Sequence, residues 1–182
     1  LHQLSVSFYK NAPHEDVYPY YRGAIDLLHC DAIHAVDSLR YYAGRSAVST
    51  VKSVVRKLDG WYDISFSALV TFENGVVGAL FANWRTGRRM FLFEFHSSNA
   101  MSIAEIDSDG KVWTDNETDP VFSESVSKTA QSTEIHRVQG FYDQARAFVD
   151  AVKSRNQLHN NLQDGVESMR LADRILAEAD NG

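Results

Sequence analysis

Strand-like segments that alternate apolar and polar side chains constrain this sequence most. From Ile64 to Phe72 every second side chain is apolar, and the residues between are mostly polar. This period of two is typical of a strand with one buried face. Asn74-Gly75 follows directly, and this pair tolerates the positive φ angles of a tight turn. The pattern predicts a β-hairpin whose second strand covers residues 76–84.

Seven segments of this kind occur in the chain, mostly joined by short turns. They cover residues 4–8, 48–58, 64–72, 76–84, 90–96, 101–106 and 111–114. Because short turns join antiparallel neighbours, we expect a mostly antiparallel sheet. Residues 85–89 are predicted to be a polar connection, and residues 11–22 and 115–136 are predicted to be loops. The first loop carries Tyr18, Tyr20 and Tyr21, which line a pocket or cover the edge of the core.

Three segments have apolar residues at helical spacing, over about residues 24–43, 140–154 and 160–179. The second helix is expected to bury one stripe in the core: Phe141, Ala145, Phe148, Val149 and Val152. Asn160 or Asn161 is expected to cap the last helix, and Asp164 suits the dipole of its first turn. The pattern predicts an α+β fold, in which helices cover one face of an open sheet.

The strand over residues 90–96 is apolar on both faces. Phe91, Phe93 and Phe95 share one side, whereas Met90 and Leu92 lie on the other. A sheet with one face in water normally alternates apolar and polar residues. Three helices are too few to cover both faces, so we expect a second subunit or a further domain to cover the other one.

Composition excludes several classes of partner. The formal net charge is −6 and no basic block occurs, which argues against nucleic acid and anionic membranes. The single cysteine excludes an internal disulfide and suits the reducing cytoplasm. The sequence shows no signal peptide and no apolar run of membrane-spanning length. The chain begins with Leu1 and enters a strand almost at once, so we expect one domain, residues 1–182, of a longer protein.

The helix predicted over residues 24–43 has two different sides. Its apolar stripe consists of Ile25, Leu28, Ala32, Val36 and Leu39. Its opposite side consists of Cys30, His34, Asp37 and Tyr41, with Asp31 one turn before His34. An imidazole among carboxylates suits proton transfer near neutral pH, whereas the simpler interpretation is a solvated polar face. Gly44 is expected to end the helix in the left-handed conformation.

The motifs of several other sites are missing. The sequence has no G-x-G-x-x-G after a strand, no phosphate-binding Gly-Lys-Ser/Thr loop and no G-x-S-x-G elbow. His29, Cys30, Asp31 and His34 are of metal-ligand types. Helical geometry points His29 away from His34, however, and no second Cys/His cluster occurs, so we expect no metal site.

The run from Asp31 to Gly44 resembles the signature helix in the C-terminal domain of the Gfo/Idh/MocA (glucose–fructose oxidoreductase / inositol dehydrogenase) family. Residues 1–11 look like the first strand of that domain, residues 94–110 like its hairpin and residues 141–176 like its closing helix pair. The resemblance implies an NAD(P)-dependent oxidoreductase acting on a sugar, cyclitol or related hydroxy compound. It also implies assembly into a homodimer or tetramer through the open sheet face.

The family's N-terminal Rossmann domain, with its Glu-Lys-Pro lysine, is absent from this chain. The resemblance therefore implies NAD or NADP in the full-length protein and none bound to this fragment. The alternative is a non-catalytic dimerisation or interaction domain that keeps the fold. An upstream G-x-G-x-x-G and Glu-Lys-Pro would favour the enzyme.

The resemblance makes His34 the acid–base residue that contacts the substrate hydroxyl. Many members carry an acid four residues before this histidine, where this chain has Cys30. Asp31 lies three residues before His34, and both offsets are neighbours on a helix, so we expect Asp31 to orient His34. Tyr41 and Cys30 are the candidate substrate contacts, and packing is the alternative for Tyr41. Asp37 and Arg40 are expected to brace the helix locally.

Overall fold

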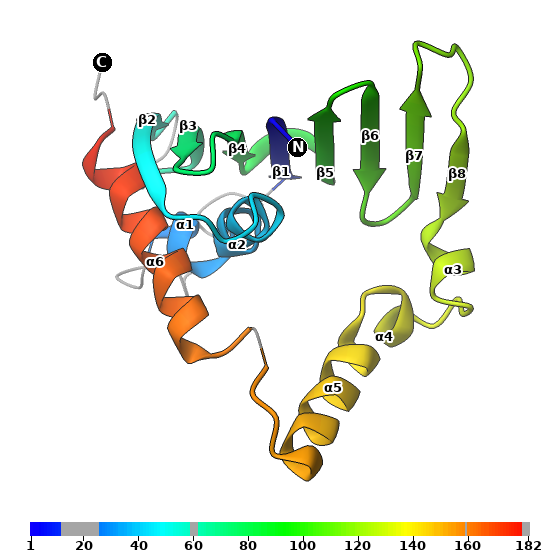
Figure 1. Cartoon of the computed structure of the whole chain (residues 1–182). Coiled ribbons are helices and arrows are strands. Elements are labelled where there is room, and N and C mark those ends of the chain that lie inside the picture. Colours follow the sequence, from blue (N-terminus) through cyan, green and yellow to red (C-terminus); the bar gives the residue numbers. More distant parts are fainter. Residues whose placement is uncertain (12–25, 59–61, 159, 180–182) are drawn as a thin grey trace.

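The chain forms an eight-stranded sheet with helices packed against part of one face (Figure 1). The computed structural model describes residues 1–11, 26–58, 62–158 and 160–179. The strands are β1 (Gln3–Asn11), β2 (Val48–Arg56), β3 (Ser65–Phe72), β4 (Val77–Asn83), β5 (Arg85–Ser97), β6 (Ala100–Glu105), β7 (Asp109–Thr114) and β8 (Phe122–Ser125). The helices are α1 (Leu27–Cys30), α2 (Ile33–Tyr42), α3 (Val126–Thr129), α4 (Ile135–Val138), α5 (Phe141–Ser154) and α6 (Leu162–Ala177).

The strand order is β2-β3-β4-β1-β5-β6-β7-β8, and every neighbouring pair is antiparallel except β1 and β4. This confirms the predicted mostly antiparallel sheet and the α+β class. β1 lies in the middle of the sheet. Its parallel partner, β4, follows it in the chain after two helices and two further strands. Parallel pairing of β1 and β4 brings the carboxyl ends of both strands to the same edge of the sheet.

The sheet differs from the prediction at two places. β5 begins at Arg85, inside the predicted polar connection, because Arg85 pairs with Asn11 at the end of β1. β8 and α3 lie within residues 115–136, which are predicted to be a loop, and α4 begins there at Ile135. β8 pairs with β7 along the edge of the sheet, and three of its four residues are exposed. Main-chain hydrogen bonds to β7 hold this strand in the sheet. Its side chains need not alternate between apolar and polar, so the sequence shows no strand pattern here.

The helix predicted over residues 24–43 is interrupted. α1 ends at Cys30 and α2 begins at Ile33, because the N–H groups of Asp31 and Ala32 both donate to the carbonyl oxygen of Leu27. The predicted apolar stripe is nevertheless buried: Leu28, Ala32, Val36 and Leu39 are all 0% exposed, and Ile25 lies outside the described residues. Gly44 has a φ of 74°, as expected for the end of this helix.

α1, α2 and α6 lie against one face of the sheet at its β2–β1 end (Figure 1). The core lies between them, with Val6 and Leu80 from the strands and Ile175 from α6 all fully buried. Among the described residues, every helix is too short or too polar to cross a membrane.

Buried polar contacts join α2 to α6. Arg40 is 6% exposed, and its Nη1 donates to Ser168 Oγ at 2.7 Å and to the Asp164 carbonyl oxygen at 3.1 Å. Arg40 Nη2 lies 3.2 Å from Asp164 Oδ1, and Ser168 Oγ donates to Asp37 Oδ1 at 2.6 Å. Arg40 Nη1 also lies 3.8 Å from Asp37 Oδ1 within α2, so these two residues brace their own helix, as expected, and in addition connect it to α6. The Asn161 side chain caps α6 by accepting from the Asp164 N–H, as predicted.

The predicted burial of the α5 stripe is wrong for this chain. Phe141 is 58% exposed, Phe148 61% and Val152 63%, and α5 stands apart from the sheet (Figure 1). The helix itself forms over the predicted range. An amphipathic pattern shows which face of a helix will be buried, and it does not show which part of the protein will cover that face.

Gly78 allows α2 to approach the sheet closely. A Cβ atom at this position would lie 2.8 Å from Leu39 Cδ1 and 3.3 Å from Phe72 Cε2. We expect Gly78→Ala to lower the free energy of unfolding by about 1–3 kcal/mol through overpacking. Gly87→Ala is the matched control, because nothing lies within 4 Å of its Cβ position. Urea denaturation tests this, and equal stability of the two variants would contradict it.

Candidate functional site

A polar cluster lies at the edge of the sheet where β1 and β4 end. Asp31, at the break between α1 and α2, accepts two hydrogen bonds on its Oδ2 atom. Lys10 Nζ, near the end of β1, lies 2.5 Å from this oxygen, and Trp84 Nε1, directly after β4, lies 3.2 Å from it. Three segments far apart in the sequence therefore meet at one carboxylate, which we call the Lys10–Asp31–Trp84 cluster.

Two aromatic rings hold the lysine of this cluster. Lys10 Nζ lies 5.0 Å from the ring centroid of Phe8 and 5.8 Å from that of Trp84. The two rings pack edge to face with centroids 5.4 Å apart, and Trp84 is only 2% exposed. A cation over aromatic faces is attracted by their quadrupoles, and the attraction grows as water is excluded. The ammonium group of Lys10 is therefore held by an ion pair and two ring contacts.

His34 lies in the first turn of α2 and is exposed, as is Cys30 at the end of α1. Within the described residues, the His34 ring makes no hydrogen bond or ion pair. Asp31 is expected to orient His34, but no hydrogen bond joins the two in the described part of the chain; Oδ2 of Asp31 bonds to Lys10 and Trp84. The imidazole is accessible to a ligand from solvent.

Tyr41 lies at the other end of α2. It follows His34 by seven residues, which corresponds to about 10 Å along the helix. Its ring is 52% exposed, packs edge-on against Tyr42, and lies 4.7 Å from the Arg45 guanidinium. The structure thus places Tyr41 with Tyr42 and Arg45 and does not bring it into the Lys10–Asp31–Trp84 cluster.

His29 has a structural environment. Its Nδ1 lies 2.7 Å from Asp26 Oδ2 and its Nε2 lies 3.0 Å from Asp173 Oδ1, so the ring bridges α1 and α6. Its side chain is 9% exposed, in keeping with the predicted direction toward the core. In the part of the chain that the structure describes, no three His, Cys, Asp or Glu side chains are grouped to hold a metal ion.

Lys10 and Trp84 were not predicted as site residues. Lys10 lies near the end of β1 and Trp84 directly after β4, and no local motif marks either residue. The parallel pairing of β1 with β4 brings the two together. The tyrosines of the predicted first loop lie outside the described residues.

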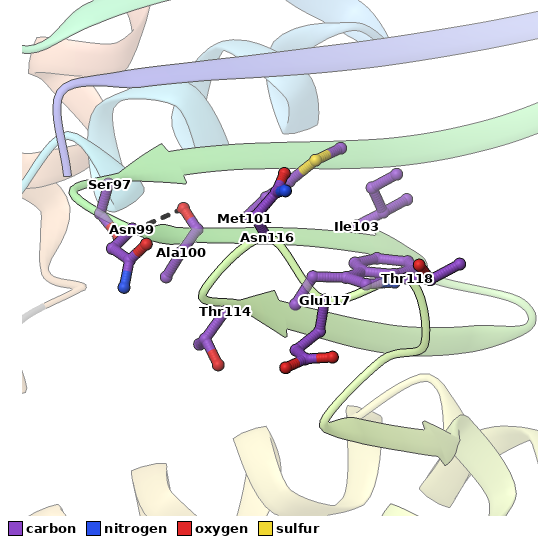
Figure 2. A pocket seen from close by; sticks show the side chains of 10 residues that line it. Ser97, Asn99, Ala100, Met101, Ile103, Thr114, Asn116, Glu117 and Thr118 are labelled. Carbon is purple, nitrogen blue, oxygen red and sulfur yellow. Dashed lines mark hydrogen bonds between the residues drawn. The ribbon is translucent and has the colours of Figure 1, made fainter.

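A separate concavity of about 520 Å³ lies on the sheet face that α2 and α6 leave open (Figure 2). Met101, Ile103 and Trp113 line it together with the turn residues Asn116 and Glu117. Met101 pairs in register with both Trp113 and His96, so these side chains share the open face. None of the predicted site residues lines this concavity.

Solved dehydrogenases of the Gfo/Idh/MocA type share this fold. An oxidoreductase from Agrobacterium radiobacter, solved with NAD+, L-tartaric acid and magnesium, matches 100% of this chain and 55% of its own, with a TM-score of 0.78 and 13% identity. Levoglucosan dehydrogenase with NADH and L-sorbose matches 98% of this chain and 56% of its own, with a TM-score of 0.77 and 16% identity.

GenD2 from gentamicin A biosynthesis, solved with NAD, matches 100% of this chain and 54% of its own, with a TM-score of 0.72 and 19% identity. This chain therefore spans about half the length of the solved structures it matches. The sequence matches no protein-family model and no curated protein. The predicted resemblance is confirmed at the level of the fold.

Tyr42 gives the α2 end of the molecule a pH dependence. Burial, and then the neighbouring Tyr41, raise the pKa of Tyr42, whose ring packs against Phe93 and Phe95. In the unfolded chain the hydroxyl group of Tyr42 ionises near pH 10. The stabilisation that burial of the neutral Tyr42 gives is therefore complete below about pH 10, and it is lost as the pH rises through the higher pKa of Tyr42 in the folded state. We expect Tyr42→Phe to flatten the alkaline fall in the free energy of unfolding. Parallel pH profiles of the variant and the unmodified chain in denaturant titrations would contradict this.

Proposed function

We propose that this chain is the C-terminal, substrate-binding half of an NAD(P)-dependent oxidoreductase that acts on a sugar, cyclitol or related hydroxy compound. One observation carries the proposal: the chain matches, over 98–100% of its length, about half of three proteins solved with NAD or NADH, among them an oxidoreductase and levoglucosan dehydrogenase. The exposed imidazole of His34, three residues after Asp31 of the Lys10–Asp31–Trp84 cluster, supports it, because oxidation of a hydroxyl group requires a proton acceptor.

His34 takes the hydroxyl proton of the substrate in this proposal. An imidazole titrates near neutral pH and works in both directions of the reaction. The described residues contain no glycine-rich turn that could cradle a pyrophosphate, so the dinucleotide belongs to the other half of the protein. A nicotinamide bound there would supply the acceptor for the hydride that leaves the substrate carbon.

We propose that the exposed apolar stripe of α5 packs against the other half of the protein, the half that binds the dinucleotide. Phe141, Phe148 and Val152 leave a row of large apolar side chains in water, which is unusual unless a partner covers them. The related structures continue for nearly as many residues again as this chain contains. A segment of the same polypeptide is therefore the proposed occupant.

A second copy of the chain is proposed to cover the open sheet face. Leu69 is 49% exposed there, Phe81 40% and Val54 38%. The register places Leu69 and Phe81 on the same face as Leu92, which together with Met90 predicts this surface. Closed symmetry with the same patch on both subunits gives a homodimer, or a tetramer if a second interface is added.

We expect His34→Ala in the full-length protein to lower kcat by roughly 10²–10⁴-fold, the usual contribution of a general acid or base. Formation of NADH from NAD with myo-inositol, D-glucose, levoglucosan or L-sorbose gives the readout. Stability should change little, because His34 is exposed. His136→Ala, at an exposed histidine of α4, is the control. Unchanged turnover in a folded His34→Ala variant would favour the non-catalytic interaction domain.

We expect the 182-residue chain to sediment as a dimer at high concentration and Phe81→Asp to make it monomeric, since the variant places a charge on the proposed contact face. Phe148→Asp introduces the same change on α5 and should leave the dimer intact. A monomer at all concentrations, or equal effects of both variants, would contradict an interface on the sheet.

A further inference from the structure

The two hydrogen bonds to Asp31 end on the same oxygen. Lys10 Nζ and Trp84 Nε1 both bond to Oδ2, and within the described residues Oδ1 accepts no hydrogen bond. A carboxylate accepts on both oxygens, so Oδ1 keeps its full capacity for a ligand. The Asp31 side chain is 20% exposed, and both Cys30 and His34 near it are exposed.

Lys10 is fixed more firmly than an ordinary surface lysine. Its side chain is 28% exposed and its ammonium group lies over two aromatic rings. Its carbonyl oxygen accepts a hydrogen bond from Thr86 Oγ1 at 3.1 Å, which ties the end of β1 to β5. A lysine held in this way selects one rotamer of Asp31, whereas a mobile lysine would not.

We propose that Lys10 is a positioning residue: by holding Oδ2 of Asp31 it presents Oδ1 as the acceptor for a substrate hydroxyl group. The inference rests on the proposed function, and it gives Asp31 a different task from orienting His34. Asp31 binds the substrate, and His34 alone moves the proton. The opposite charges of Lys10 and Asp31 cancel, so the pair suits an uncharged polyol better than a charged substrate.

The geometric part is tested without any substrate. We expect Lys10→Met in the 182-residue chain to speed hydrogen exchange at the Trp84 indole N–H and to shift its NMR signal, because Asp31 loses its stronger donor. Lys10→Arg restores a charged donor and should return the signal toward its original position. Lys128→Met is the matched control, since Lys128 forms an exposed ion pair with Glu124 on another element.

The functional part uses the full-length protein with NAD and the sugars named above. We expect Lys10→Met to lower kcat/KM by roughly 10²-fold, chiefly through a higher KM, with partial rescue by Lys10→Arg. His34→Ala should instead act on kcat. An unchanged Trp84 signal in Lys10→Met would overturn the positioning of Asp31. A shifted Trp84 signal with an unchanged KM would show that the Lys10–Asp31 contact is a structural ion pair without a role in substrate binding.

The two proposals fail in different ways. If the full-length protein oxidises none of the sugars, the proposed function fails, and the Trp84 signal still decides whether Lys10 positions Asp31. If the sugars are oxidised and Lys10→Met keeps the normal KM, the function stands and the role of Lys10 is wrong.

Discussion

The buried guanidinium of Arg40 is the interaction on which the placement of α2 depends. A charge that is 6% exposed is costly unless it is paired and hydrogen-bonded, and the partners come from α6, 124 and 128 residues later in the chain. Asp164 serves twice, because its carboxylate also lies in the first turn of α6, where the helix dipole favours a negative charge. The position of the helix that carries His34 is thus fixed by the last helix as well as by the sheet.

The same helix is held from the other side by the sheet. Leu39 packs so closely over Gly78 that a Cβ atom there would lie 2.8 Å from Leu39 Cδ1, and this close contact places α2 directly over β4. β4 runs parallel to β1, so Lys10 and Trp84 arrive at the edge of the sheet beside the start of α2. Asp31 meets both of them there, and the break between α1 and α2 lies at this point.

Much of this fold was predictable from local patterns. The seven strands, the range of α5, the Asn161 cap and the buried stripe of α2 follow from periodicity and capping, which act within a few residues. The break at Asp31 was not predictable, because its partners Lys10 and Trp84 lie 21 and 53 residues away. His34 was identified as a candidate from its helix face, whereas Lys10 enters the site only through a parallel strand pairing that no local pattern indicates.

Asp31 and His34 are three residues apart in the sequence, yet no hydrogen bond joins them among the described residues. Cys30, which the resemblance aligns with the acid of many family members, is exposed at the end of α1. At position 31 the side chain instead leaves α1 at its C-cap and turns toward Lys10 and Trp84. An aspartate at position 31 forms hydrogen bonds with a buried indole and with a lysine held over aromatic rings, and not with the histidine three residues later. Both partners bond to the Oδ2 atom of Asp31, and among the described residues the exposed His34 imidazole has no hydrogen bond to a carboxylate.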